Sequence, residues 1–433
     1  MSGWAGPSDR SLNILFLTQI IPYPPDAGPK VKTWHVLRYL VRRGHCVTLA
    51  SFVRPEEQAY VPIMEELCAQ VYTIPIHRSR PADIYYWLRS HFTGRPFLIE
   101  RDDRDAMHDL VRHILAAGKT DAIHADQLTM TQFAMRAREV QDVFGRHGRT
   151  ASNHDLSLIF DAHNAVWSII ERMGQNARWY LRPVLGLEAR RVKRYEGCVV
   201  RQFDHTLAVT ELDRQALFAA AAASRNGASS SLPAIPVIPI AVDTGHLQPL
   251  RCQPRSTNIL TLGTLHYPPN ADGIRWFMQE VYPLIQEQVP EATLTVVGKN
   301  PPNDFLESAY REPQSIQVTG YVPDLTPYLE QATVMVVPVR AGGGMRVRIL
   351  EAFARAMPVV TTTIGLEGID AQPGEDVLVA DTPFDFAAAV VRLLKDEHLR
   401  SRLATNARAL AETRYEWKVV LRGMDSVYNQ IKK

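Results

Sequence analysis

The sequence predicts an α/β protein made of two doubly wound parallel sheets, and three observations lead to that prediction. Short apolar runs rich in β-forming residues alternate with amphipathic helical segments along most of the chain. These runs are apolar on both faces, as strands buried in parallel sheets are. The alternation also occurs twice, once on each side of a polar stretch at 244–257, in a chain of 433 residues. We therefore expect two domains joined by a linker at 244–257.

The first domain is expected to span residues 12–243. A loop, IPYPPDAG, follows the first apolar run, and the helix after it carries Val36, Leu37 and Leu40 on one face before Gly44 ends it. The expected strands are NILFLTQI (13–20), CVTLASF (46–52), DAIHA (121–125), LIFDAHN (158–164), HTLAVT (205–210) and PVIPIAV (236–242).

The second domain is expected to span residues 258–414 and to be followed by a C-terminal helix at 415–433. Its expected strands are NILTLGTL (258–265), ATLTVVGK (292–299), IQVTGYV (316–322), VMVVPV (334–339), PVVTTT (358–363) and DVLVAD (376–381). Open parallel sheets bind ligands beyond the carboxyl ends of their strands. Function is therefore sought in the loops that follow these strands.

Composition and missing motifs exclude several classes of protein. A formal charge of +2 argues against nucleic acid as the main partner. The four cysteines have neither zinc-site nor disulfide-framework spacing. No GxGxxG, GxxxxGK[ST] or HExxH motif occurs, and no run of 18 apolar residues. We expect a cytoplasmic protein that at most contacts the inner face of an anionic membrane peripherally; the basic helical stretch EARRVKRYEG (188–197) is either that contact or a solvated helix.

One acidic motif could indicate metal binding. Asp103 and Asp105 form an Asp-x-Asp pair within RDDRD. Nothing around it provides a metal-site context, and a charged helix start is the favoured explanation. We expect no metal site in this protein.

A glycine-rich stretch, AGGGMRVRILEAFA (341–354), follows one of the expected strands and opens an expected helix. Gly342, Gly343 and Gly344 allow the backbone to approach a ligand closely. The helix start presents unpaired N–H groups and partial positive charge, which together form an anion site. The alternative is a tight strand-to-helix turn with no ligand.

Charged residues in the same helix extend this hypothesis. Arg346 and Arg348, expected in the first turn, are natural partners of a diphosphate. Glu351, further along, could accept hydrogen bonds from ligand hydroxyls. It could instead form a helix-face ion pair with Arg348 or Arg355, which lie three and four residues away.

An ordered set of segments resembles glycosyltransferase family 4, the retaining sugar transferases of the GT-B fold. The second half contributes LTLGTLHYPPNADGIRWF (260–277), LTVVGKNPP (294–302), VTGYVPDLTPYL (318–329) and PVRAGGGMRVRILEAFARAMPVVTTTIGLEGI (338–369). The first half contributes PYPPDAGPKVKTWHVLRYLVRRGHCVTL (22–49), FDAHNAVWSIIERM (160–173), LAVTELDRQAL (207–217) and VIPIAVD (237–243). The resemblance implies an N-terminal acceptor domain, a C-terminal donor domain, a cleft between them and a final helix that crosses back to the first domain.

The resemblance also implies roles for individual residues. Glu351 matches the glutamate that holds the ribose hydroxyls, and Tyr321 and Val322 match the loop whose backbone contacts the base. Gly28 matches a glycine-bearing loop near the donor phosphates and the acceptor. His163 matches a histidine that contacts the transferred sugar; a lone histidine at a strand end is otherwise a structural residue.

The chain departs from the family pattern at Ile240-Ala241, where an Asn-Gly is usual, and at three positions of the expected donor site. Gly343 occupies the place of the first glutamate of the family's pair. Thr264 and Asn270 occupy the places of an arginine and a lysine that clamp the diphosphate, so this clamp lacks its usual charge. We hypothesise that Arg346 and Arg348 replace it.

The resemblance implies a hexosyltransferase that moves a sugar from a nucleotide-diphosphate sugar to a saccharide or lipid-linked acceptor, with retention and without a cofactor or required metal. Envelope polysaccharide or glycolipid precursors are the expected acceptors. Two alternatives stay open. One is another GT-B enzyme, a nucleotide-sugar epimerase or a phosphorylase. The other, motivated by Gly343, is a non-catalytic sugar-nucleotide-binding partner.

Overall fold

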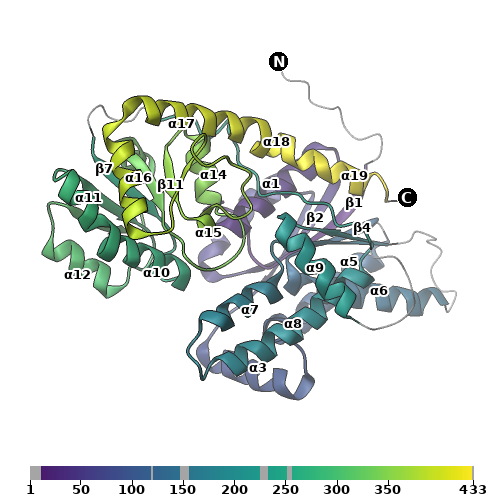
Figure 1. Ribbon diagram of the computed structural model, residues 1–433. Helices are drawn as coiled ribbons and strands as arrows, with labels where there is room; N and C mark the ends of the chain where they lie inside the picture. The colour runs from purple at the N-terminus through teal and green to yellow at the C-terminus, as the bar shows by residue number, and fades with distance from the viewer. Residues whose placement is uncertain (1–10, 119, 147–155, 225–232, 251–255, 432–433) are drawn as a thin grey trace. The chain divides into compact units, whose positions relative to one another are not determined.

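The computed structural model describes residues 11–118, 120–146, 156–224, 233–250 and 256–431 (Figure 1). The chain divides into two compact units. Unit 1 extends to Ile240 and also contains the chain from Val420 onward; unit 2 is Ala241–Val419. Each unit has its own parallel sheet and its own hydrophobic core. The predicted fold class, α/β with two doubly wound sheets, is confirmed.

Unit 1 is built on a parallel sheet with the strand order β3-β2-β1-β4-β5-β6. Its strands are β1 (Asn13–Thr18), β2 (Cys46–Val53), β3 (Gln70–Pro75), β4 (Ala122–Asp126), β5 (Ser157–Asp161) and β6 (His205–Leu207). The order reverses between β1 and β4, which pair directly through residues such as Phe16 and His124. This is the switch point at which a doubly wound sheet opens a crevice beyond its carboxyl edge.

Helices cover the sheet of unit 1 and are connected by short turns. They are α1 (Gly28–Arg42), α2 (Val61–Leu67), α3 (Arg80–Thr93), α4 (Phe97–Asp102), α5 (Asp105–Ala116), α6 (Thr131–Arg146), α7 (Val166–Asn176), α8 (Arg182–Gln202) and α9 (Glu211–Ala223), with 3-10 turns at Pro55–Tyr60 and Leu128–Met130. Gly44 follows α1 with φ +86°, so it ends that helix as predicted, in a left-handed conformation. Nowhere in the described residues is a helix long and apolar enough to cross a membrane.

Unit 2 repeats the design with the strand order β12-β11-β10-β7-β8-β9. Its strands are β7 (Asn258–Leu262), β8 (Thr293–Val297), β9 (Ile316–Gly320), β10 (Ala332–Val337), β11 (Val359–Thr361) and β12 (Leu378–Val379). Its helices are α10 (Pro268–Trp276), α11 (Tyr282–Gln288), α12 (Asn303–Arg311), α13 (Thr326–Gln331), α14 (Val347–Ala354), α15 (Thr363–Leu366), α16 (Pro383–Lys395), α17 (Glu397–Leu410) and α18 (Trp417–Val420), with π-helical turns at Phe277–Val281 and Ala411–Tyr415. The switch point of this sheet lies between β7 and β10.

Two strand predictions for unit 1 need correction. The segment expected as a strand at 236–242 forms only isolated bridges, at Val237 and Val242. Two prolines, Pro236 and Pro239, remove backbone donors there, which prevents a continuous ladder. The edge strand β3 was not predicted; its side chains are only half-buried, so it lacks the apolar run that marked the other strands.

The described part of the linker and the C-terminal segment from Val420 onward each pack within one of the two units. Within the expected linker at 244–257, residues 251–255 lie outside the described residues. The described part is held by unit 2: Thr244 bonds to Glu416, and the Leu247 carbonyl accepts from Arg408. The expected C-terminal helix at 415–433 is broken into short pieces. It contains a 3-10 turn, Leu421–Met424, and α19 (Asp425–Tyr428), which pack within unit 1.

Candidate functional site

The glycine-rich loop connects β10 to α14 at the carboxyl edge of the unit 2 sheet. Gly342 and Gly344 have φ values of +103° and +83°, conformations that side-chain-bearing residues rarely adopt. Arg346 was expected in the first turn of the helix, but it is the residue that precedes α14. Its Nη1 donates to the carbonyl oxygens of Gly343 at 2.6 Å and Gly344 at 2.7 Å. Arg346 therefore holds the loop in shape.

Arg348 carries positive charge from α14 to the end of β7. Its guanidinium donates to the Leu262 carbonyl and, at 2.5 Å, to Oδ1 of Asn270. Burial and the neighbouring Arg346 lower the pKa of Arg348 to about 10, against an opposing effect of Glu351. The group is therefore still charged at neutral pH, and it lies at the switch point of the unit 2 sheet.

Gly263, directly after β7, makes room for this arginine. A Cβ atom at this position would lie 2.6 Å from Nη1 of Arg348 and 3.4 Å from Nδ2 of Asn270. Asn270 also donates to the carbonyl of Thr264 at 3.2 Å, while Thr264 itself is exposed. The two positions that lack the expected charged residues, Thr264 and Asn270, thus lie next to the guanidinium of Arg348.

Glu351 lies on α14 and is partly buried. Burial lowers the pKa of Arg355, and the Glu351 carboxylate opposes that effect, as it does for Arg348. The Arg355 guanidinium donates to the backbone carbonyl of Glu351 at 3.3 Å. Glu351 therefore interacts electrostatically with both arginines, as the helix-face alternative predicted, from the helix that follows the glycine-rich loop.

The ends of β8 and β9 extend the same edge of the sheet. Gly320 ends β9 with φ +74°, and its carbonyl accepts from the N–H of Gly298 at 2.9 Å. Tyr321 follows with its ring 59% exposed and the Lys299 ammonium 4.5 Å from the ring centroid. Val322 is half-buried beside it. The edge thus offers an exposed aromatic ring at β9 and positive charge at β7 and β10.

In unit 1, His163 lies in a buried polar network at the carboxyl ends of β4 and β5. Its Nε2 is 2.7 Å from Oδ1 of Asp126, the last residue of β4. The other carboxylate oxygen of Asp126 accepts from the hydroxyls of Thr18 at 3.0 Å and Thr33 at 2.8 Å. Gln127 follows with φ +74° and ψ 160°, a strained conformation for a residue with a side chain. Three side-chain contacts and a strained turn therefore fix the position of Asp126.

Asp161 and His124 connect the network around His163 to Tyr428 in the C-terminal segment. Its Oδ1 accepts from the buried Lys32 ammonium, and its Oδ2 lies 3.5 Å from Nε2 of His124. Nδ1 of His124 is 2.7 Å from the hydroxyl of Tyr428. Burial by itself would raise the pKa of the Asp161 carboxyl, but Lys32 and the two histidines hold that pKa well below its usual range. The carboxylate is therefore ionised at neutral pH.

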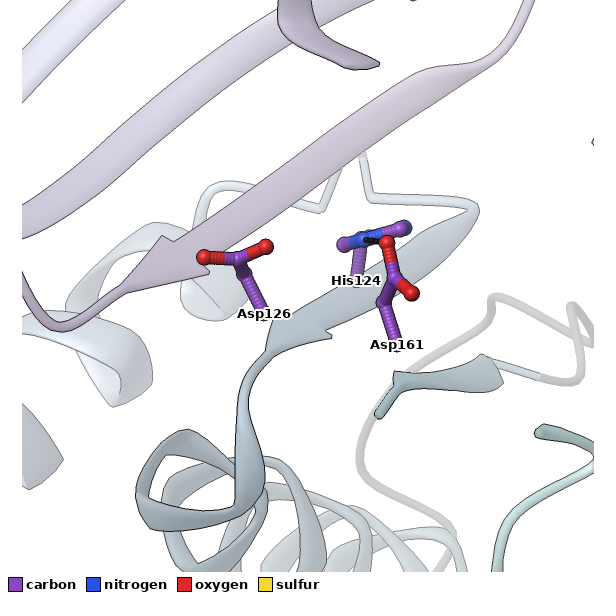
Figure 2. A group of neighbouring side chains, drawn as sticks. All are labelled: His124, Asp126 and Asp161. Atoms are coloured by element: carbon purple, nitrogen blue, oxygen red, sulfur yellow. Dashed lines mark ion pairs between the residues drawn. The ribbon is translucent and has the colours of Figure 1, made fainter. Parts of the chain in front are cut away.

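Figure 2 shows His124 and Asp126 on one strand and Asp161 on the next, with ligand atoms of the three lying within 4.8 Å of one another. Such a group has the geometry to hold a metal ion. Lys32 already neutralises Asp161, however, and a dication would add like charge beside that ammonium. We interpret the group as a charge-compensated network that positions His163.

Sequence reasoning named Gly28 and His163 in unit 1 but not Lys32, Thr33 and Asp126, which lie in the network around His163. Gly28 begins α1 on the loop after β1, and the same helix carries Lys32 and Thr33 into the network. The sequence did contain a signal for Lys32 and Thr33, because these two polar residues interrupt a helix face that is otherwise apolar. Within the RDDRD motif, Asp105 begins α5, as the helix-start interpretation predicted. Asp102 instead ends α4 and Asp103 follows it, and their carboxylates accept from Arg78 and Arg95.

Comparison with known proteins bears on both units. Residues 256–396 match the family model described as Glycosyl transferases group 1. This chain carries a group 1 glycosyl transferase domain. The glycine-rich loop, Arg346, Arg348, Glu351, Thr264, Tyr321 and Val322 all lie within this group 1 domain, whereas Gly28 and His163 lie in unit 1, outside the match.

A stretch of 169 residues is 27% identical to the "Uncharacterized 44.6 kDa protein in cps region" of Klebsiella pneumoniae. It covers 38% of this chain and 44% of that protein, so the chain spans less than half of the relative's length. Two solved structures resemble this chain over nearly its whole length. Sucrose-phosphate synthase from Thermosynechococcus elongatus has a TM-score of 0.65 at 16% identity, covering 97% of this chain and 99% of that one. HepE of Anabaena, in complex with UDP and glucose, has a TM-score of 0.64 at 13% identity, covering 96% and 99%. The fold is therefore GT-B.

Proposed function

We propose that this protein is a retaining glycosyltransferase of family 4 that moves a hexosyl group from a nucleotide-diphosphate sugar to a hydroxyl of an acceptor. One observation carries the proposal: the charged guanidinium of Arg348 is held at the switch point of the unit 2 sheet, beside a glycine-rich loop. Doubly wound sheets bind ligands at that point, and a diphosphate requires fixed positive charge there.

The chemistry follows from the charge that develops during transfer. As the anomeric bond breaks, negative charge builds on the diphosphate leaving group, and donors that are already in place stabilise it without reorganisation. Arg348 and the N–H groups at the start of α14 provide such donors, while Arg346 keeps the loop open by binding its carbonyls. Thr264 and Gly342–Gly344 line the same edge. The proposal assigns charge stabilisation to Arg348 and the start of α14, with Arg346 shaping the loop, and requires no metal ion and no cofactor.

The remaining contacts are assigned from the family resemblance, to residues that lie near the carboxyl edges of the two sheets. Glu351 accepts hydrogen bonds from the ribose hydroxyls, and Tyr321 and Val322 contact the base beyond β9. His163 contacts the transferred sugar, with Asp126 fixing its imidazole ring. Gly28 lets the start of α1 approach the phosphates or the acceptor.

The comparisons support a nucleotide and an acceptor class. HepE was crystallised with UDP and glucose, which supports UDP as the nucleotide. The Klebsiella pneumoniae relative is in a cps region, which supports a saccharide or lipid-linked acceptor in envelope polysaccharide or glycolipid assembly. The proposal includes a cytoplasmic location with peripheral contact to an anionic membrane.

The experiment that tests the donor site is a thermal-shift screen of the full chain against nucleoside diphosphates and their sugars. A ligand that binds the native state raises the melting temperature, and we expect UDP and a UDP-sugar to do so most. Calorimetry then compares Glu351→Ala with Glu307→Ala, an exposed glutamate of α12. Weaker UDP binding in the first variant alone supports the assignment; unchanged affinity in Glu351→Ala overturns it.

Gly343 favours a second candidate, a non-catalytic protein that binds sugar nucleotides, because no carboxylate stands at that position of the loop. Incubation of the protein with UDP-sugars and a broad acceptor panel separates the two. Donor consumption that depends on an acceptor supports transfer, whereas binding without consumption supports the second candidate. Turnover without acceptor, or with inorganic phosphate, would indicate an epimerase or a phosphorylase.

A further inference from the structure

Exposed apolar side chains of unit 1 are concentrated on two helical segments. One is α3, and the other is 173–187, which contains the end of α7, the connecting turn and the start of α8. Together they carry eleven of the nineteen exposed large apolar side chains found in the described residues: Ile84, Tyr85, Trp87, Leu88, Phe92, Met173, Trp179, Tyr180, Leu181, Val184 and Leu187. Phe92 is 91% exposed and Trp179 is 80% exposed. So dense a grouping marks an interaction site.

These two segments lie next to each other in unit 1 (Figure 1). The carboxylate of Glu188, on α8, accepts from the N–H of Phe97, just beyond the end of α3, at 2.7 Å. His91 of α3 also lies close enough to Glu188 to affect its pKa, which burial raises and His91 partly lowers again. We call the combined face of α3 and 171–194 the docking surface.

The docking surface is strongly basic where α7 and α8 meet. Residues 171–194 contain seven arginines and lysines but only two glutamates, in a chain whose net charge is +2. Among the described residues, the exposed side chains of Arg190 and Arg194 have no hydrogen-bond or ion-pair partner. An identical basic face would repel a second copy of this chain, so the charge favours an anionic partner.

A pocket of ≈ 480 Å³ opens between α7 and α8 on this surface. It is lined by Arg182, Arg190 and Lys193, with Glu171 as the opposing acid. The Lys193 ammonium lies 3.9 Å from the ring centroid of Trp167, another lining residue. Clustered cations beside an aromatic wall suit a phosphate that is attached to an apolar tail.

We propose that the docking surface binds an anionic phospholipid bilayer, with its apolar side chains in the headgroup region and the pocket between α7 and α8 holding a lipid phosphate. Aromatic residues are favoured at this depth of a bilayer because one end of the ring is apolar and the other can contact water. The surface combines exposed aromatic residues with the basic residues of 171–194. This deepens the membrane contact in the proposed function by naming its residues and its lipid class.

The test measures binding of the full chain to vesicles, without donor or acceptor. Vesicles of phosphatidylcholine alone are compared with vesicles of phosphatidylcholine and phosphatidylglycerol in equal parts. We expect cosedimentation with the anionic vesicles only, weakening as salt is added. Arg190→Gln and Arg194→Gln should each reduce binding about fivefold, because a basic residue near such a surface contributes about 1 kcal/mol. Phe92→Ser or Trp179→Ser should reduce it about tenfold.

Matched controls replace equally exposed residues elsewhere: Arg136→Gln on α6 for the charge variants and Tyr310→Ser in unit 2 for the apolar ones. Both should bind as the wild type does. Equal binding to the two vesicle types, or charge variants that bind normally, overturns the proposal. So does a change in self-association, measured by sedimentation, when Phe92 and Trp179 are replaced. If transfer to a soluble acceptor fails while vesicle binding succeeds, the reaction is wrong and the docking surface stands.

Discussion

The guanidinium of Arg348 donates to the side-chain oxygen of Asn270 at 2.5 Å and to the backbone carbonyl of Leu262. Arg348 lies on α14, the helix that follows β10. Its acceptors lie at the end of β7 and in α10, the helix that follows β7. The guanidinium therefore links the two strands that flank the switch point. In the pattern that this chain resembles, a lysine would stand at Asn270. Here an arginine from the adjacent helix brings the positive charge to the same place.

Arg348→Gln should weaken UDP binding about 10- to 100-fold. A hydrogen bond to a charged partner contributes about 1.5–3 kcal/mol, and glutamine keeps polarity but loses the charge. Calorimetric titration with UDP measures the effect. Arg355→Gln, at the other end of the same helix, is the control and should bind UDP normally. Equal losses in both variants would indicate general damage to α14.

Gly263→Ala should also reduce UDP affinity, although it changes no charge. The added Cβ would lie 2.6 Å from Nη1 of Arg348, so the guanidinium must leave its acceptors. Gly186→Ala is the control, because nothing lies within 4 Å of a Cβ at that helical position. The same titration applies. An affinity equal to that of the wild type would show that the position of Arg348 is not needed for binding.

The sequence predicted the position of the glycine-rich loop and of Arg348 better than the histidine network, for a physical reason. Gly342–Gly344 and Arg348 are close together along the chain and follow one buried strand, so local pattern was sufficient. His163 depends on Asp126, Thr18 and Lys32, which meet only when strands distant in sequence pair in parallel. No local pattern encodes such contacts. The half-buried strand β3 was missed because apolar periodicity is weak at a sheet edge.

Lys32→Met should lower the free energy of unfolding by about 3–5 kcal/mol, because it leaves the buried carboxylate of Asp161 without its cation. The double variant Lys32→Met, Asp161→Asn should regain most of that loss. Arg214→Met, which removes the cation of an exposed pair with Glu211 at 2.8 Å on α9, is the control and should cost at most about 1 kcal/mol. Denaturant unfolding measures all of these.

The Lys32 prediction also has a pH dependence. The pKa of Asp161 is lower in the folded chain than in the unfolded chain. The ion pair therefore stabilises the protein at pH values above the usual carboxyl range, and that stabilisation is lost as the pH falls. The difference in stability between the wild type and Lys32→Met should shrink on acidification. Two additive single variants, with no recovery in the double, would contradict the pairing.

Glu196 should make the stability of unit 1 fall as the pH rises toward neutrality. Its buried carboxyl accepts from the N–H groups of Val166 at 2.7 Å and Trp167 at 3.1 Å, at the start of α7 and shortly after His163. Burial raises its pKa from 4.5 to about 8, despite these two donors. The folded chain thus binds the proton more tightly than the unfolded chain, so stability is greatest below pH 4.5 and is lost as the pH rises through about 8.

Melting temperatures of the wild type and Glu196→Gln, measured across this pH range, test the prediction. Glutamine cannot ionise, and one of its polar atoms is a donor that faces a backbone N–H, so the variant should be less stable at acidic pH. The advantage of the wild type should narrow as the pH rises, by about 1.4 kcal/mol for each pKa unit of the shift. Glu171→Gln, an exposed residue on α7, is the control. An advantage that stays constant or widens with pH would mean that Glu196 remains ionised in the folded chain, with the α7 N–H groups outweighing burial.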